Sequence, residues 1–541
     1  MGQSFIDGTV NLASLTNPGV YTDIIPPQPI VYGAPTSIEG IVGVAQWGPV
    51  GSPLFINTPA QCQAIYGTPT SRTGLSNGGF QYDLPTYVWA ASQQGNQNNA
   101  AGGVTFAAVR VTDGTDVAAT SIVLTTCITF TSKYTGSLGN QTSFIFATGT
   151  APNSFAVSIS FPGRAPELFN NITGAGNAFW VNLAAAINNG TAYRPASQII
   201  VATAGAGTAV PTVGLTGTFT GGTDGATTIT TSVLVGVDTI PRKGMYALRG
   251  TGIDAFALCD VVDVTSWVTQ TSFGLSENCF PVFTTAAGDT VSSCAASRVT
   301  NALDYFYAWL ICGDWPTFFD QSQTGLSSST RLVSPQAIGL GLLGNLSPEQ
   351  SPLNKQLNNV VATQRGAAGI PYGAGEIQQA ELGGIDLIVP PVNTPGGAYF
   401  SFITGRNAWS NTGGQGIEFT RMTFFLARSF GKVAGKFVGQ LQSISPNDPT
   451  RQNVYFAFNS FLANLANPAL GSNGYGLIDV WAVQCDLNNN PPSLQAQGFL
   501  NVLVTVRYLN IVRYFIIKLA GGGNVQVTTQ ATPPSPSQFG I

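Results

Sequence analysis

The stretch Ile41-Val42-Gly43-Val44-Ala45-Gln46-Trp47-Gly48-Pro49 begins with small apolar residues and ends in turn-forming ones. An uncharged apolar run of this length predicts a strand that is buried on both faces. The Trp-Gly-Pro that follows predicts a turn, because proline fixes φ and removes a backbone donor. We therefore expect residues 41–45 to form an interior strand.

The residues before this strand have few signals of regular structure. Asn17-Pro18-Gly19-Val20-Tyr21 is followed by Pro26-Pro27-Gln28-Pro29. Prolines at this density are incompatible with a helix or a central strand. We expect residues 1–28 to be an extended arm.

Residues 29–114 and 236–380 are predicted to form an α/β domain. Two apolar runs predict buried strands, a helix is expected to follow them, and a further strand comes next, an alternation typical of an α/β layer. The stretch 316–352 is rich in Gly, Ser and Pro and is expected to be a loop. The predicted strands and helix are Ala255–Val262, Cys279–Thr284, Ser292–Ala308 and Trp309–Cys312.

Residues 115–235 differ in composition, being rich in Thr, Gly and Ala with short apolar or alternating runs. One helix is expected over Ala178–Asn188, where Trp180, Leu183 and Ile187 fall on one side of a 3.6-residue period. Gly221-Gly222-Thr223-Asp224-Gly225 then predicts a turn. We interpret this segment as an inserted β-rich domain.

Residues 381–520 are predicted to form a C-terminal domain with helices and strands, followed by a flexible tail over 521–541. A helix is expected over Glu418–Leu441, and a second begins after Asp448 with Pro449 in its first position. Two strands are expected next, over Val502–Tyr508 and Ile511–Leu519. The predicted apolar stripe of the second helix is Val454, Phe458, Phe461, Leu462 and Leu465. The fold class is thus multidomain α+β.

Charge is scarce in this chain: 9% of the 541 residues are charged, against about 25% in an average soluble protein. Histidine is absent, which excludes Ser-His-Asp and Cys-His catalysis. The net charge of −4 argues against nucleic-acid binding by the chain as a whole. A large protein with so little charge is typical of an assembly subunit, although a secreted β-rich protein has a similar composition. Neither a secretory signal nor a membrane-spanning helix is expected.

Four basic residues, Arg421, Arg428, Lys432 and Lys436, follow one another at steps of 7, 4 and 4 along the first C-terminal helix. Those steps place them within an arc of about 80°. Like charges four residues apart repel each other. A solvated helix face is the ordinary explanation. We favour a surface that faces a negatively charged partner.

Several strings resemble catalytic or cofactor motifs without their context. Gly74–Gly78 matches G-x-S-x-G, but the chain has no histidine to serve as its base. Gly339–Gly344 matches G-x-G-x-x-G, but no predicted strand leads into it. The acids Asp254, Asp260 and Asp263 are expected to have structural or capping roles. We expect no enzyme activity, no cofactor and no metal site.

The seven cysteines lie far apart and include no C-x-x-C pair, so they are expected to be buried free thiols. Disulfides between subunits in an oxidising exterior are the alternative.

A set of short motifs in a constant order resembles the contractile tail sheath proteins of bacteriophages, which are related to the sheaths of R-type bacteriocins and type VI secretion systems. Pro18-Gly19-Val20-Tyr21 and the Ile41–Pro49 stretch are similar to the opening of these proteins. Each motif is weak by itself, but their order extends over most of the chain. The further matching motifs are Tyr66-Gly67, Gly102-Gly103, Val109-Arg110-Val111, Lys133–Gly136, Gly139-Asn140, Gly221–Gly225, Pro446-Asn447-Asp448, Phe461-Leu462, Val483–Asp486 and Asn488–Asn490.

The resemblance implies a structural subunit that polymerises as a six-start helical sheath around an inner tail tube. It implies that the arms exchange strands with neighbouring copies, with Pro18, Gly19, Val20, Tyr21, Val525 and Val527 as inter-subunit arm residues. Contraction would be a rigid-body rearrangement that drives the tube through the host envelope. The implied partners are the tube, baseplate and terminator proteins, with assembly in the host cytoplasm and residence in the virion tail.

An extracellular β-rich adhesin or carbohydrate-binding protein is the alternative. It fits the Thr-, Asn- and Gly-rich composition, but not the paired arms or the helical C-terminal domain.

Overall fold

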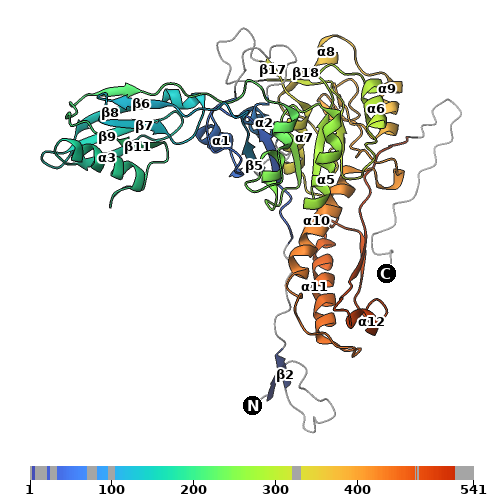
Figure 1. Cartoon of the computed structure of the whole chain (residues 1–541). Helices are drawn as coiled ribbons and strands as arrows, with labels where there is room; N and C mark the ends of the chain where they lie inside the picture. The colour runs from blue at the N-terminus through green and yellow to red at the C-terminus, as the bar shows by residue number, and fades with distance from the viewer. Residues whose placement is uncertain are drawn as a thin grey trace. The chain divides into compact units, whose positions relative to one another are not determined.

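The computed structural model describes residues 3–6, 21–24, 33–69, 82–94, 104–319, 330–469, 471 and 474–517 (Figure 1). Residues up to Tyr508 form one compact unit, and the residues from Leu509 onward form a second. The G-x-S-x-G string, the arm residues Pro18, Gly19 and Val20 and the predicted tail over 521–541 lie outside the described residues.

A six-stranded sheet organises the first unit, in the order β15-β14-β13-β3-β5-β4. The strand expected at residues 41–45 is β3, which pairs in parallel with β13 on one side and with β5 on the other. Only β4, at the edge, runs antiparallel to its neighbour. The bounds are β3 (Ile38–Gly43), β4 (Leu54–Ile56), β5 (Thr105–Arg110), β13 (Ala255–Leu258), β14 (Phe280–Thr284) and β15 (Trp309–Ile311).

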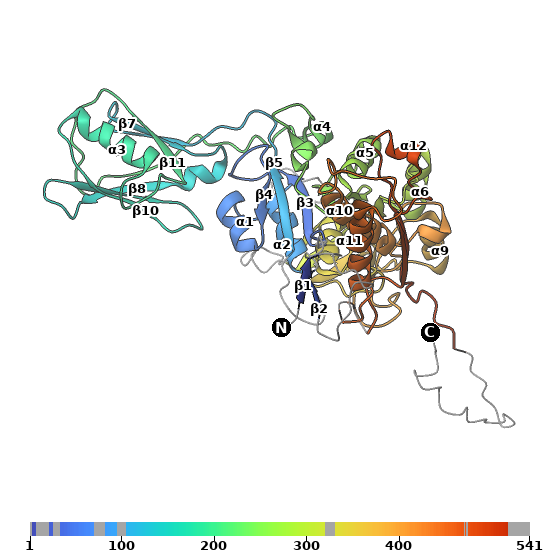
Figure 2. The same ribbon diagram turned by 90° about the horizontal axis from the view of Figure 1, so that it is seen from below.

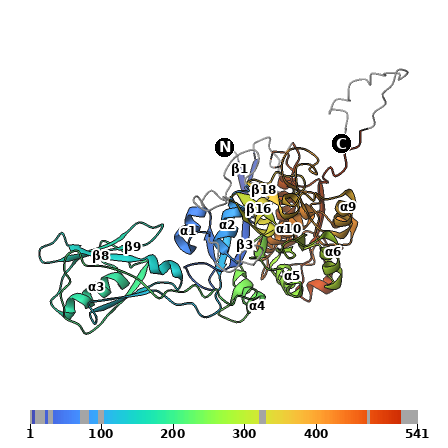
Figure 3. The same cartoon turned by 90° about the horizontal axis from the view of Figure 1, so that it is seen from above.

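Helices cover both faces of this sheet, which explains why most residues of its central strands are apolar. Ile41 on one face contacts a core to which α2 and α7 contribute, and Val42 on the other lies in a core that includes Phe273 of α5. Figure 3 shows α2 beside β3. The helix bounds in this region are α1 (Pro59–Tyr66), α2 (Leu84–Ser92), α4 (Thr231–Val235), α5 (Trp267–Glu277), α6 (Val291–Thr300), α7 (Pro335–Asn345), α8 (Gln364–Ala367) and α9 (Ala374–Gly383).

The prediction of a loop over 316–352 is wrong, because this stretch contains α7. Every residue of α7 from Pro335 to Gly344 is buried. A Cβ on Gly341 would lie 2.2 Å from the carbonyl oxygen of Ala91 in α2, so glycine permits close contact between the two helices. The other two glycines of the G-x-G-x-x-G string are also closely packed, Gly339 against Trp309 of β15 and Gly344 against Val104. The string is therefore a packing motif.

Two small sheets complete this region. One has the order β17-β16-β18, and the other pairs β19 with β20. Asp386 bridges in parallel to Ile311 at the β15 edge, and residues 385–389 pack in the same core as β15. The bounds are β16 (Pro316–Phe319), β17 (Thr330–Leu332), β18 (Val360–Thr363), β19 (Ile388–Val389) and β20 (Ser401–Phe402).

Residues 120–218 build two sheets, β10-β9-β8-β12 and β11-β7-β6, that share one core with the helix α3. The helix expected at Ala178–Asn188 is observed with one additional residue at each end. Figure 2 shows α3 between strands of the two sheets. The bounds are β6 (Thr120–Val123), β7 (Ile128–Ser132), β8 (Ser143–Thr148), β9 (Phe155–Ser160), β10 (Glu167–Ile172), α3 (Asn177–Asn189), β11 (Ile200–Ala204) and β12 (Thr216–Thr218).

The next core lies between the paired helices α10 (Ile417–Ala434) and α11 (Pro449–Leu465). The carboxylate of Asp448 caps α11 by accepting a bond from the Arg451 amide at 2.9 Å, and Pro449 follows in the first turn, as predicted. All members of the predicted apolar stripe are buried. Aromatic contacts such as Phe425 to Phe461 join the two helices, which lie side by side in Figures 1 and 2.

A two-stranded antiparallel ribbon covers this core, made of β21 (Val480–Gln484) and β22 (Leu503–Arg507), with the short helix α12 (Pro492–Gln495) in their connection. Side chains alternate between the two faces of β22, and the face with Val504 and Val506 packs on the helices. The prediction that Ile511–Leu519 is the partner strand is wrong for its described part, because residues 511–517 form no strand. The partner of β22 is β21.

The two described pieces of the N-terminal segment form a separate parallel pair, β1 (Gln3–Ile6) with β2 (Tyr21–Ile24). Among the described residues this pair joins no other sheet.

Candidate functional site

The predicted basic stripe divides into a buried half and an exposed half. The prediction of a helix as far as Leu441 is wrong at its end, because α10 ends at Ala434 and Lys436 lies in the turn that follows. The side chain of Arg421 is fully buried and that of Arg428 is 7% exposed, whereas Lys432 and Lys436 are exposed. The prediction that all four residues face outward as one surface is therefore wrong for Arg421 and Arg428. The spacing was correct, but the face of α10 from Arg421 to Arg428 is buried against residues around the central sheet.

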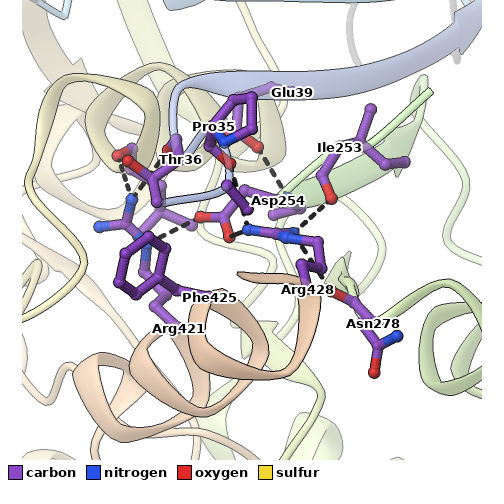
Figure 4. A network of polar contacts seen from close by, with 12 residues as sticks. Pro35, Thr36, Glu39, Ile253, Asp254, Asn278, Arg421, Phe425 and Arg428 are labelled. Carbon is purple, nitrogen blue, oxygen red and sulfur yellow. Dashed lines mark hydrogen bonds and ion pairs between the residues drawn. The ribbon is translucent and has the colours of Figure 1, made fainter. Parts of the chain in front are cut away.

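The buried half is organised by Asp254, which immediately precedes β13 (Figure 4). Arg421 Nε donates to Asp254 Oδ2 at 3.0 Å, and Arg428 Nη2 donates to Asp254 Oδ1 at 2.6 Å. Asp254 is fully buried. Two guanidinium groups thus share one carboxylate out of contact with solvent, which is tolerable only where their other donors are also satisfied.

Backbone carbonyl groups accept most of the remaining donors. Arg421 binds the carbonyl oxygens of Leu343 at 2.8 Å and Leu346 at 3.0 Å, at the end of α7. Arg428 binds that of Ile253 at 2.6 Å and that of Asn278 at 3.1 Å. The cluster therefore fastens α10 to α7, to the approach of β13 and to the end of α5.

The same cluster holds the segment that leads from the N-terminal residues into β3. Arg421 Nη2 donates to the Thr36 carbonyl at 3.3 Å, and Arg428 Nη2 donates to the Pro35 carbonyl at 3.4 Å. The Ala34 amide donates to Ser429 Oγ at 2.9 Å. We call residues 33–36 the arm root. The arm root is bonded to α10 through its main-chain groups. Its side-chain sequence therefore gave no signal of these contacts.

Glu39 adds a second buried carboxyl group beside the cluster (Figure 4). Its Oε2 accepts a bond from the Ala255 amide at 3.0 Å. Its Oε1 has no hydrogen-bond partner among the described residues. Burial first, and then the negative charge of Asp254, raise the pKa of Glu39 well above its ordinary value. Sequence reasoning missed Glu39, because the predicted strand began at residue 41 whereas β3 begins at Ile38. An acid directly before an apolar run was the available signal.

The exposed half of the stripe continues into the connection between α10 and α11. Beyond Lys432 and Lys436, the large apolar side chains of Val438, Leu441 and Ile444 are 84%, 90% and 65% exposed. The surface formed by these five residues, which we call the α10 tip, combines positive charge with apolar side chains. Such a surface is typical of a protein contact site.

The other acids named from the sequence have structural contacts. Asp260 accepts bonds from the Tyr82 amide and the Tyr87 hydroxyl, and Asp263 accepts one from the Thr265 amide. All seven cysteines are buried free thiols, as predicted. In the described parts of the chain, no group of three or more Cys, Asp or Glu residues has metal-binding geometry, and no helix is both long and apolar enough to span a membrane. Val525 and Val527 lie outside the described residues, and Tyr21 is the first residue of β2.

Comparison with solved structures identifies the fold. A sheath tail protein from Desulfitobacterium hafniense aligns over 86% of this chain and 93% of its own, with a TM-score of 0.54 and 14% identity. One from Listeria innocua aligns over 88% and 96%, with a TM-score of 0.55 and 13% identity. The chain has the fold of tail sheath proteins. The contracted helical sheath of the anti-feeding prophage aligns over 94% and 99%, with a TM-score of 0.50 and 12% identity.

The sheath fold agrees with the resemblance noted in the short motifs. No protein-family model matches the chain, and no curated protein matches it in sequence.

Proposed function

We propose that this chain is a non-enzymatic structural subunit of a contractile tail sheath. In this proposal, copies polymerise around a tail tube as a six-start helix, contract by rigid-body rearrangement and drive the tube through the host envelope. The sheath fold supports the proposal, but a fold hosts several functions. The further support comes from the C-terminal ribbon, the arm root and the α10 tip.

The carrying observation is the incomplete sheet at β21 and β22. One face of this ribbon packs on the core of α10 and α11, so the ribbon is held in place. In the described structure each of its strands is paired along one edge only. An unpaired edge on a fixed strand accepts an added strand through main-chain hydrogen bonds. In a polymer, arms from neighbouring copies would complete this sheet.

Two segments have the properties of donors. The pair β1 and β2 joins no other sheet among the described residues. In the second unit, Phe515 is 83% and Ile516 80% exposed, within a run of β-prone residues. Exposed residues of this kind are stabilised when a partner covers them. Donation of these ends to adjacent copies explains both features.

The arm root explains how such a link would transmit force. A neighbour that holds the N-terminal strands pulls on residues 33–36, which are bonded to α10 through Arg421, Arg428 and Ser429. Asp254, which is bonded to both arginines, would transmit this force to the central sheet. A subunit fastened at this point moves as one body, which is what contraction without unfolding requires.

The remaining partners follow from the same proposal. The α10 tip would contact the tube, with Lys432 and Lys436 facing acidic groups on it. Baseplate and terminator proteins would contact the ends of the polymer. The protein would assemble in the host cytoplasm and reside in the tail of the virion.

Negative-stain electron microscopy of the purified full chain tests this function. Tubes or stacked rings are expected, because strand exchange between identical copies repeats without limit. Monodisperse globules over a concentration series and across salt conditions would contradict the proposal and favour the adhesin alternative.

A further inference from the structure

The inserted segment, residues 115–235, has no fully exposed charged side chain. It contains six charged residues, and each of them is buried or half-buried. Soluble proteins commonly use exposed charge, lysine above all, to prevent sheet edges from pairing with other chains. This segment has to protect its edges by another means. The six residues are Asp116, Lys133, Arg164, Glu167, Arg194 and Asp224.

The strand β11 is one edge that needs protection. It lies at the end of its sheet, and its sequence Ile-Val-Ala-Thr-Ala contains neither charge nor proline. The side chain of Val201 is 45% exposed. Short uncharged β-prone segments at a sheet edge are sites of unwanted pairing.

The register shows which backbone groups this edge presents. The Lys133 amide donates to Ile199 O, and the Gly205 amide donates to Cys127 O, so Ile199 and Gly205 point toward β7. Because hydrogen bonding alternates along an antiparallel pair, Ile200, Ala202 and Ala204 point away from β7. Ala202 is thus the centre of the open edge.

A single side chain satisfies both backbone groups of Ala202. Asn188, near the end of α3, accepts a bond from the Ala202 amide at 2.9 Å and donates to the Ala202 carbonyl at 2.7 Å. This is the pair of bonds that a residue of an added strand would form. The Ile200 amide is also occupied, by Ser197 Oγ at 3.0 Å.

The C-terminal ribbon differs at the corresponding place. There, Asn489 contacts the Gln484 carbonyl at 2.8 Å, at the last residue of β21 rather than at its centre. Asn188 thus covers the middle of the β11 edge, whereas Asn489 covers only the end of β21.

We propose that Asn188 is a specificity-determining residue that closes the β11 edge against edge-to-edge pairing with β11 of a second copy. The occupant it excludes is another copy, because β11 itself carries no charge that would repel a second β11, and a strand can pair antiparallel with itself across a two-fold axis. This inference goes beyond the sheath proposal and does not depend on it.

The test compares full-length variants by sedimentation velocity and by amide hydrogen exchange at Ala202. Asn188→Ala removes both bonds and opens the edge, so exchange at Ala202 should accelerate about tenfold, as for loss of one hydrogen bond. The same variant should self-associate with concentration, beyond any association of the wild type. Asn182→Ala is the matched control: Asn182 lies on the same helix and donates to Thr173 O instead.

Asn188→Lys separates edge protection from loss of stability. It lacks the same two bonds but places a charge at the edge, so it should sediment as the wild type does. Association of Asn188→Lys equal to that of Asn188→Ala would overturn the proposal, since unfolding would then be the cause. Sedimentation of Asn188→Ala as wild type would also overturn it, because an uncovered edge would have proved harmless.

Discussion

Arg428 Nη2 lies 2.6 Å from Asp254 Oδ1, in a place where the carboxylate is fully buried. This ion pair connects α10 with the approach to the central strand β13. Arg421 uses the other oxygen of the same carboxylate. Asp254 therefore fixes the position of α10, which binds the arm root, against the central sheet.

Asp254→Asn should destabilise the protein strongly. The substitution keeps the shape of the side chain but leaves two buried guanidinium groups without a counter-charge, which costs about 3–5 kcal/mol. Urea denaturation followed by circular dichroism measures the loss. Asp263→Asn is the control: Asp263 makes a local bond to the Thr265 amide and should change the free energy of unfolding by about 1 kcal/mol or less. Equal effects of the two substitutions would show that the cluster contributes no special stability.

Glu39→Gln should become increasingly stabilising relative to the wild type as the pH rises. The pKa of Glu39 is raised in the folded state by burial and by Asp254. The stability contributed by its protonated form is complete below the unfolded-state pKa and is lost as the pH rises through the folded-state pKa. Glutamine resembles the protonated carboxyl and does not titrate.

Denaturation midpoints from about pH 4 to about pH 9 measure this difference. Glu376→Gln is the control, because Glu376 is half-buried and pairs with Arg365. Parallel curves for Glu39→Gln and the wild type would contradict the raised pKa.

The native protein should resist thiol reagents. All seven cysteines are buried, and burial raises the pKa of Cys485 to about 11 and raises that of Cys259 well above its ordinary value. Both effects suppress the reactive thiolate at neutral pH. Mass spectrometry after alkylation should find no label on the folded protein and seven labels after unfolding. Subunits linked by disulfides on a non-reducing gel would contradict this.

Local signals in the sequence were sufficient for some elements and not for others. Asp448 and Pro449 gave a correct start for α11, because a helix cap is a short-range interaction. The helix α7 was missed, because its glycines lower helix propensity and are explained only by close packing, such as that of Gly341 on Ala91 of α2. Such a contact between residues distant in sequence is not visible in a local pattern.

The basic stripe shows the same limit at the site itself. Periodicity placed Arg421 and Arg428 correctly on one face of α10, but it could not tell which half of that face was covered. The partner Asp254 lies far away in sequence, and its proximity depends on the whole sheet order. Likewise, β22 was predicted from its alternation, while its partner β21 was not.

Deletion of residues 1–28 should abolish polymerisation but leave a folded monomer. The described core begins at Gly33, and the root contacts to Ser429 and Arg428 remain after this deletion. Circular dichroism and thermal unfolding should match the wild type, while electron microscopy should show no tubes. Long ordered tubes from the truncated chain would contradict the exchange of N-terminal strands.

Charge reversal at the α10 tip should weaken attachment to the tube without affecting the fold. Lys432→Glu with Lys436→Glu replaces two exposed positive charges by negative ones, so attraction to an acidic tube becomes repulsion. Co-sedimentation with purified tubes should fall, and more steeply at low salt, where charges are less screened. Lys243→Glu is the control, because this lysine is also exposed but lies near the central sheet. If the double variant binds tubes as well as the control does, the α10 tip is a solvated surface, and the tube contact must lie elsewhere on the subunit.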